Sequence, residues 1–177
     1  MNCRHLTVGY VQLYTGDGKG KTTAALGQAL RASGHGLRTY IGQFMKGQEY
    51  GELTALREHP MITIEQYGDV RCIHREEVMP EHIAQANAGL QRAREMMLSG
   101  EYDIIVLDEV NVTIWFGLLD LDDVLDLLNE RPADVELILT GRRAPQALIE
   151  NADLVTEMRE IKHYYAQGVG ARTGIER

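Results

Sequence analysis

The 177-residue chain is long enough for about one α/β domain, and its 44% hydrophobic and 25% charged residues are ordinary for a globular protein. A formal net charge of −8 argues against a mainly nucleic-acid partner, and no apolar run approaches the roughly 20 residues that a membrane span needs. Two cysteines cannot form a disulfide framework, so we expect a reduced, cytoplasmic setting, with residues 1–177 as a single domain.

Apolar, β-rich runs alternate with helix-like segments, which predicts an α/β fold: a mostly parallel sheet of about six strands with helices on both faces. The expected strands are Leu6–Thr15, Leu37–Phe44, Ile62–Tyr67, Asp103–Glu109, Val135–Thr140 and Leu154–Met158. The expected helices run from about Lys21 to Ser33 with Gly34 as C-cap, from about Pro80 to Ser99 before Gly100, from an Asp120 cap, and from Pro145 to about Asn151.

Helical spacing also predicts which faces are buried. In the second helix the expected buried residues are Ile83, Asn87, Leu90, Ala93 and Met97. In the third they are Leu121, Val124, Leu125 and Leu128. Residues 46–60 and the tail after 161 follow no clean period and come after strands, where parallel α/β folds place their ligand loops.

The strongest chemical signal is a glycine-rich segment between the first expected strand and helix. Glycines allow a tight turn whose N–H groups point at one anion, and the helix amino terminus adds its positive dipole end. Lys21 suits the outer phosphates of ATP, and the Thr22 hydroxyl suits Mg²⁺. Thr15 stands where the usual motif begins with glycine. The residues expected to bind phosphate are Gly16, Asp17, Gly18, Lys19, Gly20, Lys21, Thr22 and Thr23.

A second signal is an apolar strand, residues 104–107, that ends in Asp108 and Glu109. This is the Walker B arrangement, in which a carboxylate reaches the magnesium shell opposite the P-loop threonine. Together the two motifs predict a P-loop NTPase domain of the RecA-like kind that binds ATP and Mg²⁺. Spacing alone does not decide between Asp108 and Glu109 as the direct ligand.

Weaker signals follow other strands. Arg142 comes after the fifth strand, where a guanidinium can reach a phosphate, and Lys46 follows the second strand. Both are also compatible with solvated surface residues. Cys72 and His74 have a spacing that hints at a metal, but no second pair of ligands accompanies them, so we expect no metal site there.

These motifs together resemble the P-loop ATP:corrinoid adenosyltransferases, and the resemblance covers residues 11–176. Four of its markers are residues 15–23, Gln43-Phe-Met-Lys-Gly47, Leu107-Asp-Glu-Val110 and Thr140-Gly-Arg142, of which many ATPases share the first and the third. More specific markers stand in the tail: residues 152–159, Ile161-Lys-His163 and Gly174-Ile-Glu176.

The resemblance implies transfer of the 5′-deoxyadenosyl group of ATP to the cobalt of a Co(I) corrinoid, with release of triphosphate, in adenosylcobalamin biosynthesis or salvage. It implies a separate electron donor, such as a flavodoxin or flavin reductase, and a homodimer. It also implies that ATP lies in the P-loop in the direction opposite to that in hydrolases, and that Thr22 and Glu109 approach the magnesium ion. Co(I) is itself the nucleophile, so the protein needs to position the substrates and stabilise the departing triphosphate.

Two departures from the family pattern stand out. Well-known members have a Phe-x-Trp pair after the third strand that displaces the lower axial ligand of cobalt, whereas residues 68–74 here contain no aromatic residue. Val70 and Ile73 are therefore the candidates for apolar contact with the lower corrin face. The second departure is Tyr164, where many relatives have proline.

Two other functions are compatible with the P-loop. One is a small ATPase or kinase that cleaves the β–γ bond and yields ADP. The other is a non-enzymatic regulator that binds ATP without turnover. Neither requires the motifs of the carboxyl-terminal tail, so the adenosyltransferase function is favoured.

Overall fold

The computed structural model describes residues 6–69, 71 and 74–176, and its centre is a six-stranded parallel sheet. The strand order is β3-β2-β4-β5-β1-β6, and every neighbouring pair is parallel. The strands are β1 (Val11–Thr15), β2 (Thr39–Phe44), β3 (Ile62–Tyr67), β4 (Ile104–Asp108), β5 (Glu136–Thr140) and β6 (Leu154–Glu157). All six expected strands are present, so the α/β prediction is confirmed.

The first strand is shorter than expected, because it begins at Val11 instead of Leu6. The Tyr10 N–H donates to the Glu136 carboxylate at 2.7 Å and not to a strand carbonyl. Gly9 lies so close to the Val135 carbonyl that an added Cβ would come within 2.1 Å of its oxygen. The chain therefore crosses the end of β5 before it joins the sheet.

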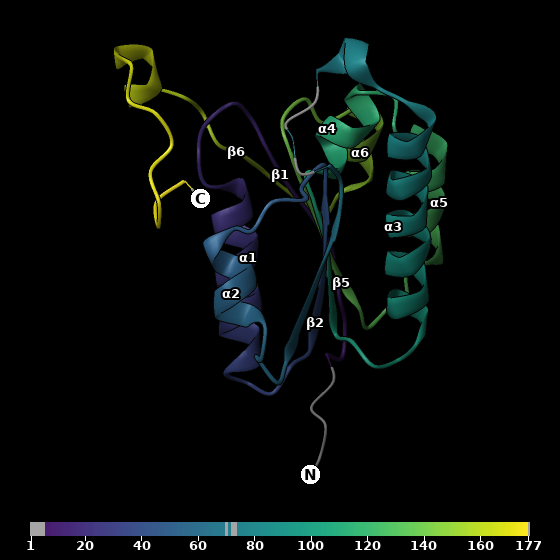
Figure 1. The fold of residues 1–177 in the computed structure, drawn as a ribbon. Helices are drawn as coiled ribbons and strands as arrows, with labels where there is room; N and C mark the ends of the chain where they lie inside the picture. The colour runs from purple at the N-terminus through teal and green to yellow at the C-terminus, as the bar shows by residue number, and fades with distance from the viewer. Residues whose placement is uncertain (1–5, 70, 72–73, 177) are drawn as a thin grey trace.

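Helices cover both faces of the sheet (Figure 1). The helices are α1 (Lys21–Ser33), α2 (Gly51–Leu56), α3 (Pro80–Leu98), α4 (Val110–Trp115), α5 (Leu121–Glu130) and α6 (Gln146–Asn151), with 3₁₀ turns η1 (Arg75–Glu77) and η2 (Tyr164–Gln167). Helices α1 and α2 lie on one face, and α3 and α5 lie on the other. The six-residue helices α2 and α4 are too short to give a periodic signal and were not predicted, whereas α6, of the same length, was predicted from Pro145 at its start. Among the described residues no helix is long and apolar enough to cross a membrane.

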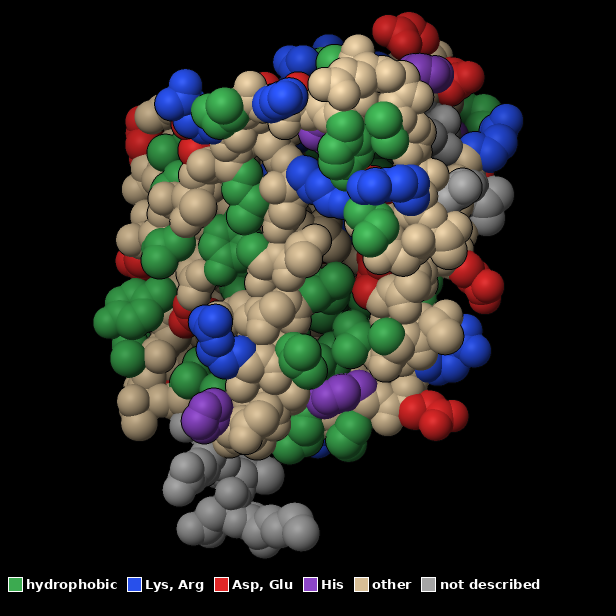
Figure 2. Space-filling model, turned by 90° about the vertical axis from the view of Figure 1, so that its left-hand side faces the viewer, with side chains coloured by type: hydrophobic (Ala, Val, Ile, Leu, Met, Phe, Trp, Pro, Cys, Tyr) green, Lys and Arg blue, Asp and Glu red, His purple; other side chains and the backbone are tan. Residues whose placement is uncertain are grey.

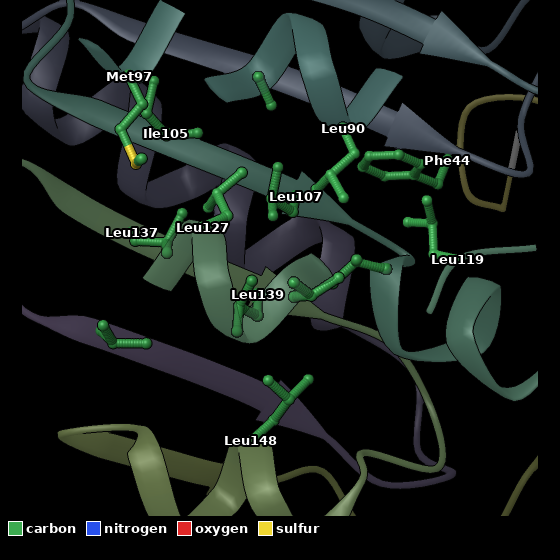
Figure 3. Packing of buried hydrophobic residues seen from close by; sticks show 14 of the residues in the cluster. Phe44, Leu90, Met97, Ile105, Leu107, Leu119, Leu127, Leu137, Leu139 and Leu148 are labelled. Atoms are coloured by element: carbon green, nitrogen blue, oxygen red, sulfur yellow. The ribbon is translucent and has the colours of Figure 1, made fainter. Parts of the chain in front are cut away.

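The core has two layers because successive strand residues point to opposite faces. In β4, Ile105 and Leu107 pack toward α3 and α5 (Figure 3). Ile104 and Val106 pack on the other face toward the small residues of α1, among them Ala29. All four β4 side chains are at most 2% exposed, which is typical of a central parallel strand.

The buried stripe of α3 is rotated relative to the prediction. Ile83 is 40% exposed and Asn87 is exposed, whereas His82, Ala86 and Gly89 are buried beside the correctly predicted residues. The reason is that small residues face β3, where Gly89 leaves room for the ring of Tyr67. In α5 the fully buried residues are Val124 and Leu127, and the predicted Leu121, Leu125 and Leu128 are only partly buried.

The two expected glycine caps, Gly34 and Gly100, differ from each other in backbone conformation. Gly34 follows α1 as expected, but its φ of −63° is right-handed, and the left-handed turn comes at Gly36, with a φ of 80°. Gly100 has a φ of 73°, the left-handed conformation that ends α3.

We predict opposite effects for two glycine-to-alanine changes within helices. In Gly89→Ala the new methyl would meet Tyr67 Cγ at 2.5 Å, so the free energy of unfolding should fall by roughly 1–3 kcal/mol. In Gly27→Ala nothing lies within 4 Å, so stability should rise by about 0.5–1 kcal/mol. Urea unfolding of both variants tests this, and a stabilised Gly89→Ala would contradict the packing of α3 on β3.

Candidate functional site

The glycine-rich loop lies at the carboxyl edge of the sheet, between β1 and α1. Gly16 and Gly20 have φ values of 92° and 119°, which side chains rarely permit. The loop also rests against the end of β6, because the Gly18 N–H donates to the Met158 carbonyl at 2.7 Å. A Cβ at Gly16 would lie 2.4 Å from the same oxygen, so only glycine fits there.

Lys21 places its ammonium group inside this loop. The Nζ atom donates to the carbonyl oxygens of Gly16 at 2.7 Å and Gly18 at 2.8 Å, and the residue is only 6% exposed. Burial lowers the pKa of Lys21, although Glu109 and other nearby carboxylates partly offset this. The loop therefore has a cation fixed at its centre, which suits an anionic ligand.

Asp108, at the end of β4, is the meeting point of four elements. Its Oδ1 accepts from the hydroxyls of Thr22 at 2.8 Å and Thr140 at 2.7 Å. Its Oδ2 accepts from Lys46 Nζ at 2.8 Å and Gln43 Nε2 at 3.1 Å. Both oxygens of this 1% exposed residue are thus already used within the protein.

Lys46 follows β2 and supplies the positive charge beside Asp108. Burial alone would lower the pKa of Lys46, but the Asp108 carboxylate and the more distant Glu52 hold it above its usual value. The Lys46 Nζ also lies 3.4 Å from the Thr22 hydroxyl and 3.9 Å from Glu52. Lys46 therefore faces the site, as its position after β2 suggested.

Glu109, the next residue, differs from Asp108 in its backbone conformation, its hydrogen-bond partners and its access to the cavity. Its backbone is left-handed, with a φ of 65°, and its N–H donates to the Thr140 hydroxyl at 2.9 Å. Within the described part of the chain its carboxylate accepts no hydrogen bond, and it lines the cavity in front of the loop. Burial, and then the neighbouring Asp108, raise the pKa of Glu109. Glu109 thus presents an available carboxylate to the cavity.

Backbone strain gathers at this edge of the sheet. Among the described residues, the non-glycine residues with positive φ are Met45 at 55°, Glu109 at 65° and Arg143 at 58°. Each follows the carboxyl end of a strand, namely β2, β4 or β5. Such conformations cost free energy and cluster where a fold must aim side chains.

A cavity of about 480 Å³ opens in front of the loop. Two further segments line it: the stretch after β2, through Tyr50, Gly51 and Glu52, and the carboxyl-terminal tail. Both are segments that the sequence predicted to be ligand loops. On the face shown in Figure 2, most Lys and Arg side chains lie in the upper half of the molecule, at the end that contains the loop.

The tail is attached to the loop by ionic contacts. Lys19 Nζ donates to the Ile175 carbonyl at 2.8 Å and lies 3.0 Å from Glu176 Oε1. Glu176 also accepts hydrogen bonds from Arg172 and from the hydroxyl of Tyr164. Arg172 is the main cause that holds the pKa of Glu176 well below its usual value, and Tyr164 and Lys19 add to it. Tyr164, the departure noted above, thus donates a hydrogen bond within the tail, to the same carboxylate that contacts Lys19.

The structure brings most of the predicted site residues together. Those that line the cavity are Gly18, Lys19, Gly20, Lys21, Thr22, Thr23, Lys46, Glu109 and Arg142. Gly16, Asp17 and Asp108 are not part of the lining, although Asp108 lies beneath it. Val70, Cys72 and Ile73 lie outside the described residues. The described residues contain no group of three His, Cys, Asp or Glu side chains that could bind a metal.

Some lining residues were not predicted as site residues. They are Leu26, Tyr50, Gly51, Glu52, His163, Gly174, Ile175 and Glu176. The tail residues were visible as sequence motifs, and their motif could have been taken as a sign of direct contact. The residues around Tyr50 gave no signal beyond their position after β2.

Two features define the class of this protein. A glycine-rich loop joins β1 to α1, and the buried Asp108 ends β4, which is separated from β1 in the sheet by β5. Together they place the chain in the P-loop NTPase-like class of α/β proteins. Residues 7–177 match the sequence profile of the ATP:corrinoid adenosyltransferase BtuR/CobO/CobP family, and the chain belongs to this family.

Three curated relatives are named corrinoid adenosyltransferases. The chain is 36% identical over 170 residues to the corrinoid adenosyltransferase of Escherichia coli, covering 95% of this chain and 85% of that protein. It is 35% identical over 170 residues to the corrinoid adenosyltransferase of Pseudomonas aeruginosa, covering 95% and 83%. A similar match, 35% identical and covering 95% and 85%, is the corrinoid adenosyltransferase CobA of Salmonella typhimurium.

We predict that the two adjacent acids affect stability in opposite directions. The pKa of Glu109 is raised above 4.5 in the folded state, so the folded protein holds this proton more tightly than the unfolded chain does. As pH rises from 4.5 through the raised pKa, ionisation of Glu109 therefore lowers the stability of the folded protein. Glu109→Gln should therefore stabilise the nucleotide-free protein at about pH 8, with a smaller gain at about pH 5.

Asp108→Asn is the matched control for this prediction. It leaves the buried Lys46 without its counter-ion and should lower the free energy of unfolding by roughly 2–3 kcal/mol. Denaturant unfolding across this pH range measures both changes. If the free energy of unfolding changed in the same direction in both variants, the opposite roles assigned to Asp108 and Glu109 in stability would be wrong.

Proposed function

We propose that the cavity in front of residues 16–23 is the active site of an ATP:corrinoid adenosyltransferase. The enzyme transfers the 5′-deoxyadenosyl group of ATP to the cobalt of a reduced Co(I) corrinoid and releases triphosphate. Beyond family membership, the observation that supports this site is the closure of a P-loop cavity by the tail that bears the specific motifs. A hydrolase would have no need for such a tail.

The residues of the chain have two tasks in this reaction. The N–H groups of the loop, together with Lys21, bind the triphosphate and stabilise the negative charge that it gains on leaving. Arg142, on the cavity wall, is placed to contribute a second cation. The new bond forms between cobalt and C5′ as the C5′–O bond breaks, so no side-chain nucleophile or base is required. Positioning of the two substrates supplies the rest.

The residues present fit a magnesium ion. Thr22 and Glu109 both line the cavity, and the Glu109 carboxylate, which accepts no hydrogen bond from any described residue, is a hard oxygen ligand of the kind that Mg²⁺ prefers. Asp108 already accepts four hydrogen bonds, so we assign it to holding Thr22 in place instead of direct ligation. When bound, the ion would neutralise charge on the triphosphate.

The family resemblance supports three further proposals. ATP lies in the loop with C5′ directed toward the corrinoid, a separate flavodoxin or flavin reductase supplies the electron, and the enzyme is a homodimer. Exposed apolar side chains available for dimer contacts are Leu154 and Val155 of the edge strand β6, which are 44% and 41% exposed, and Leu30 of α1, which is 60% exposed.

The direct test is incubation with ATP, Mg²⁺ and a chemically reduced corrinoid under anoxic, light-protected conditions. We expect a light-sensitive Co–C bond in the product and one triphosphate for each bond formed. Release of ADP and phosphate would instead identify a hydrolase or kinase. Binding of ATP without any product would identify a regulator.

Lys21→Ala should lower kcat/KM for ATP by about 10- to 150-fold, because a charge-assisted contact to phosphate contributes roughly 1.5–3 kcal/mol. Lys19→Ala is the comparison within the same loop. Its ammonium contacts Glu176 and is more exposed, so a smaller loss is expected. Steady-state kinetics measure both, and near-normal turnover of Lys21→Ala would refute the assigned role of the loop.

A further inference from the structure

Trp115, the single tryptophan of the chain, stands at the end of α4 with its side chain 37% exposed. Helix α4 follows β4 directly, so it lies at the same edge of the sheet as the loop, at the top of Figure 1. A large aromatic side chain left partly exposed at this edge offers an apolar face that a ligand can cover.

Two guanidinium groups approach the indole ring from different parts of the chain. The Arg143 Cζ lies 4.3 Å from the ring centroid and the Arg75 Cζ lies 5.2 Å from it. Both arginines are exposed, and among the described residues neither forms an ion pair with a carboxylate. In a chain with a net charge of −8, this cluster combines the apolar face of an indole with two guanidinium groups that can donate to acceptor oxygens of a ligand.

The loop after β5 connects this cluster to the nucleotide cavity. Gly141 and Arg143 are both left-handed, with φ values of 131° and 58°, and Arg142 stands between them. Arg142 lines the cavity, while Arg143 lies over Trp115. The buried Asn111 fixes this turn to α4, because its Nδ2 donates to the Gly141 carbonyl at 3.0 Å. The cavity and the Trp115 cluster are therefore adjacent parts of one surface.

We propose that Trp115, Arg75 and Arg143 receive the corrin ring of the substrate, an inference that rests on the proposed adenosyltransferase function. The indole lies against the apolar face of the macrocycle. The two guanidinium groups leave the ring of Trp115 as the corrin arrives and donate to the amide oxygens around its edge.

Equilibrium binding of Co(II) corrinoids in the presence of ATP and Mg²⁺ tests the proposal without requiring turnover. Ultrafiltration with cob(II)alamin and with cob(II)inamide gives the Kd for each variant. Trp115→Ala should weaken both corrinoids about tenfold or more, and Trp115→Phe should retain most of the affinity. The Kd for ATP alone should change by no more than about twofold.

Matched variants separate this effect from general damage. Tyr10→Ala removes another exposed aromatic residue, near the amino end of β1, and should leave corrinoid binding unchanged. Arg75→Ala and Arg143→Gly should each weaken binding about three- to tenfold, and glycine preserves the left-handed backbone of residue 143. Thermal unfolding identifies any variant that fails to fold; if Trp115→Ala does, the two arginine variants decide the outcome, and unchanged corrinoid affinity in both would overturn the proposal.

Unchanged corrinoid affinity in Trp115→Ala would overturn the proposal. So would a loss confined to cob(II)alamin, because the contact would then be to its nucleotide loop. A rate defect seen only with a protein reductant would instead make the cluster a docking site for the electron donor. Corrinoid binding that depends on Trp115 in an enzyme that forms no Co–C bond would refute the proposed function while leaving the site in place.

Discussion

A carboxylate removed from water needs hydrogen bonds and a counter-ion. Asp108 obtains its hydrogen bonds from Thr22 at the start of α1, Gln43 of β2 and Thr140 of β5, and its counter-ion from Lys46 in the loop after β2. Each partner holds one of the segments that surround the cavity. Thr22 fixes the start of α1, Thr140 fixes the end of β5, and Lys46 fixes the loop after β2. The geometry of the phosphate-binding edge is thus set by a single buried charge whose partners come from across the sheet.

The same arrangement explains why two adjacent acids take different roles. Asp108 continues the strand and points into the protein, whereas the left-handed turn at Glu109 directs the next side chain to the cavity. The first carboxylate is stabilised by its partners and contributes to folding. The second is half-buried and has no such partners among the described residues, and its raised pKa reflects a cost that the fold bears at the place where a cation would be bound.

The sheet, the order of its elements and the phosphate loop could be predicted from sequence, because continuous apolar, β-rich runs and glycine spacing report local constraints directly. The turn at Glu109 could not be predicted, since spacing does not reveal a left-handed backbone. The buried stripe of α3 could not be predicted either. Gly89 and Ala86 are buried and Ile83 is exposed, because the ring of Tyr67 leaves room only for a small residue at Gly89. The cluster at Trp115 joins residues 75, 115 and 143, and only the folded chain brings them together.

The contact between the phosphate loop and β6 has a consequence for local motion. β6 is an edge strand with all four side chains exposed, so few buried contacts oppose its detachment from β1. Yet the Met158 carbonyl, just beyond this strand, accepts the N–H of Gly18 and leaves no room for a side chain at Gly16. Transient opening of β6 would therefore release the loop from its support. A ligand that requires the closed loop must then slow the hydrogen exchange of the β6 amides, although no β6 residue lines the cavity.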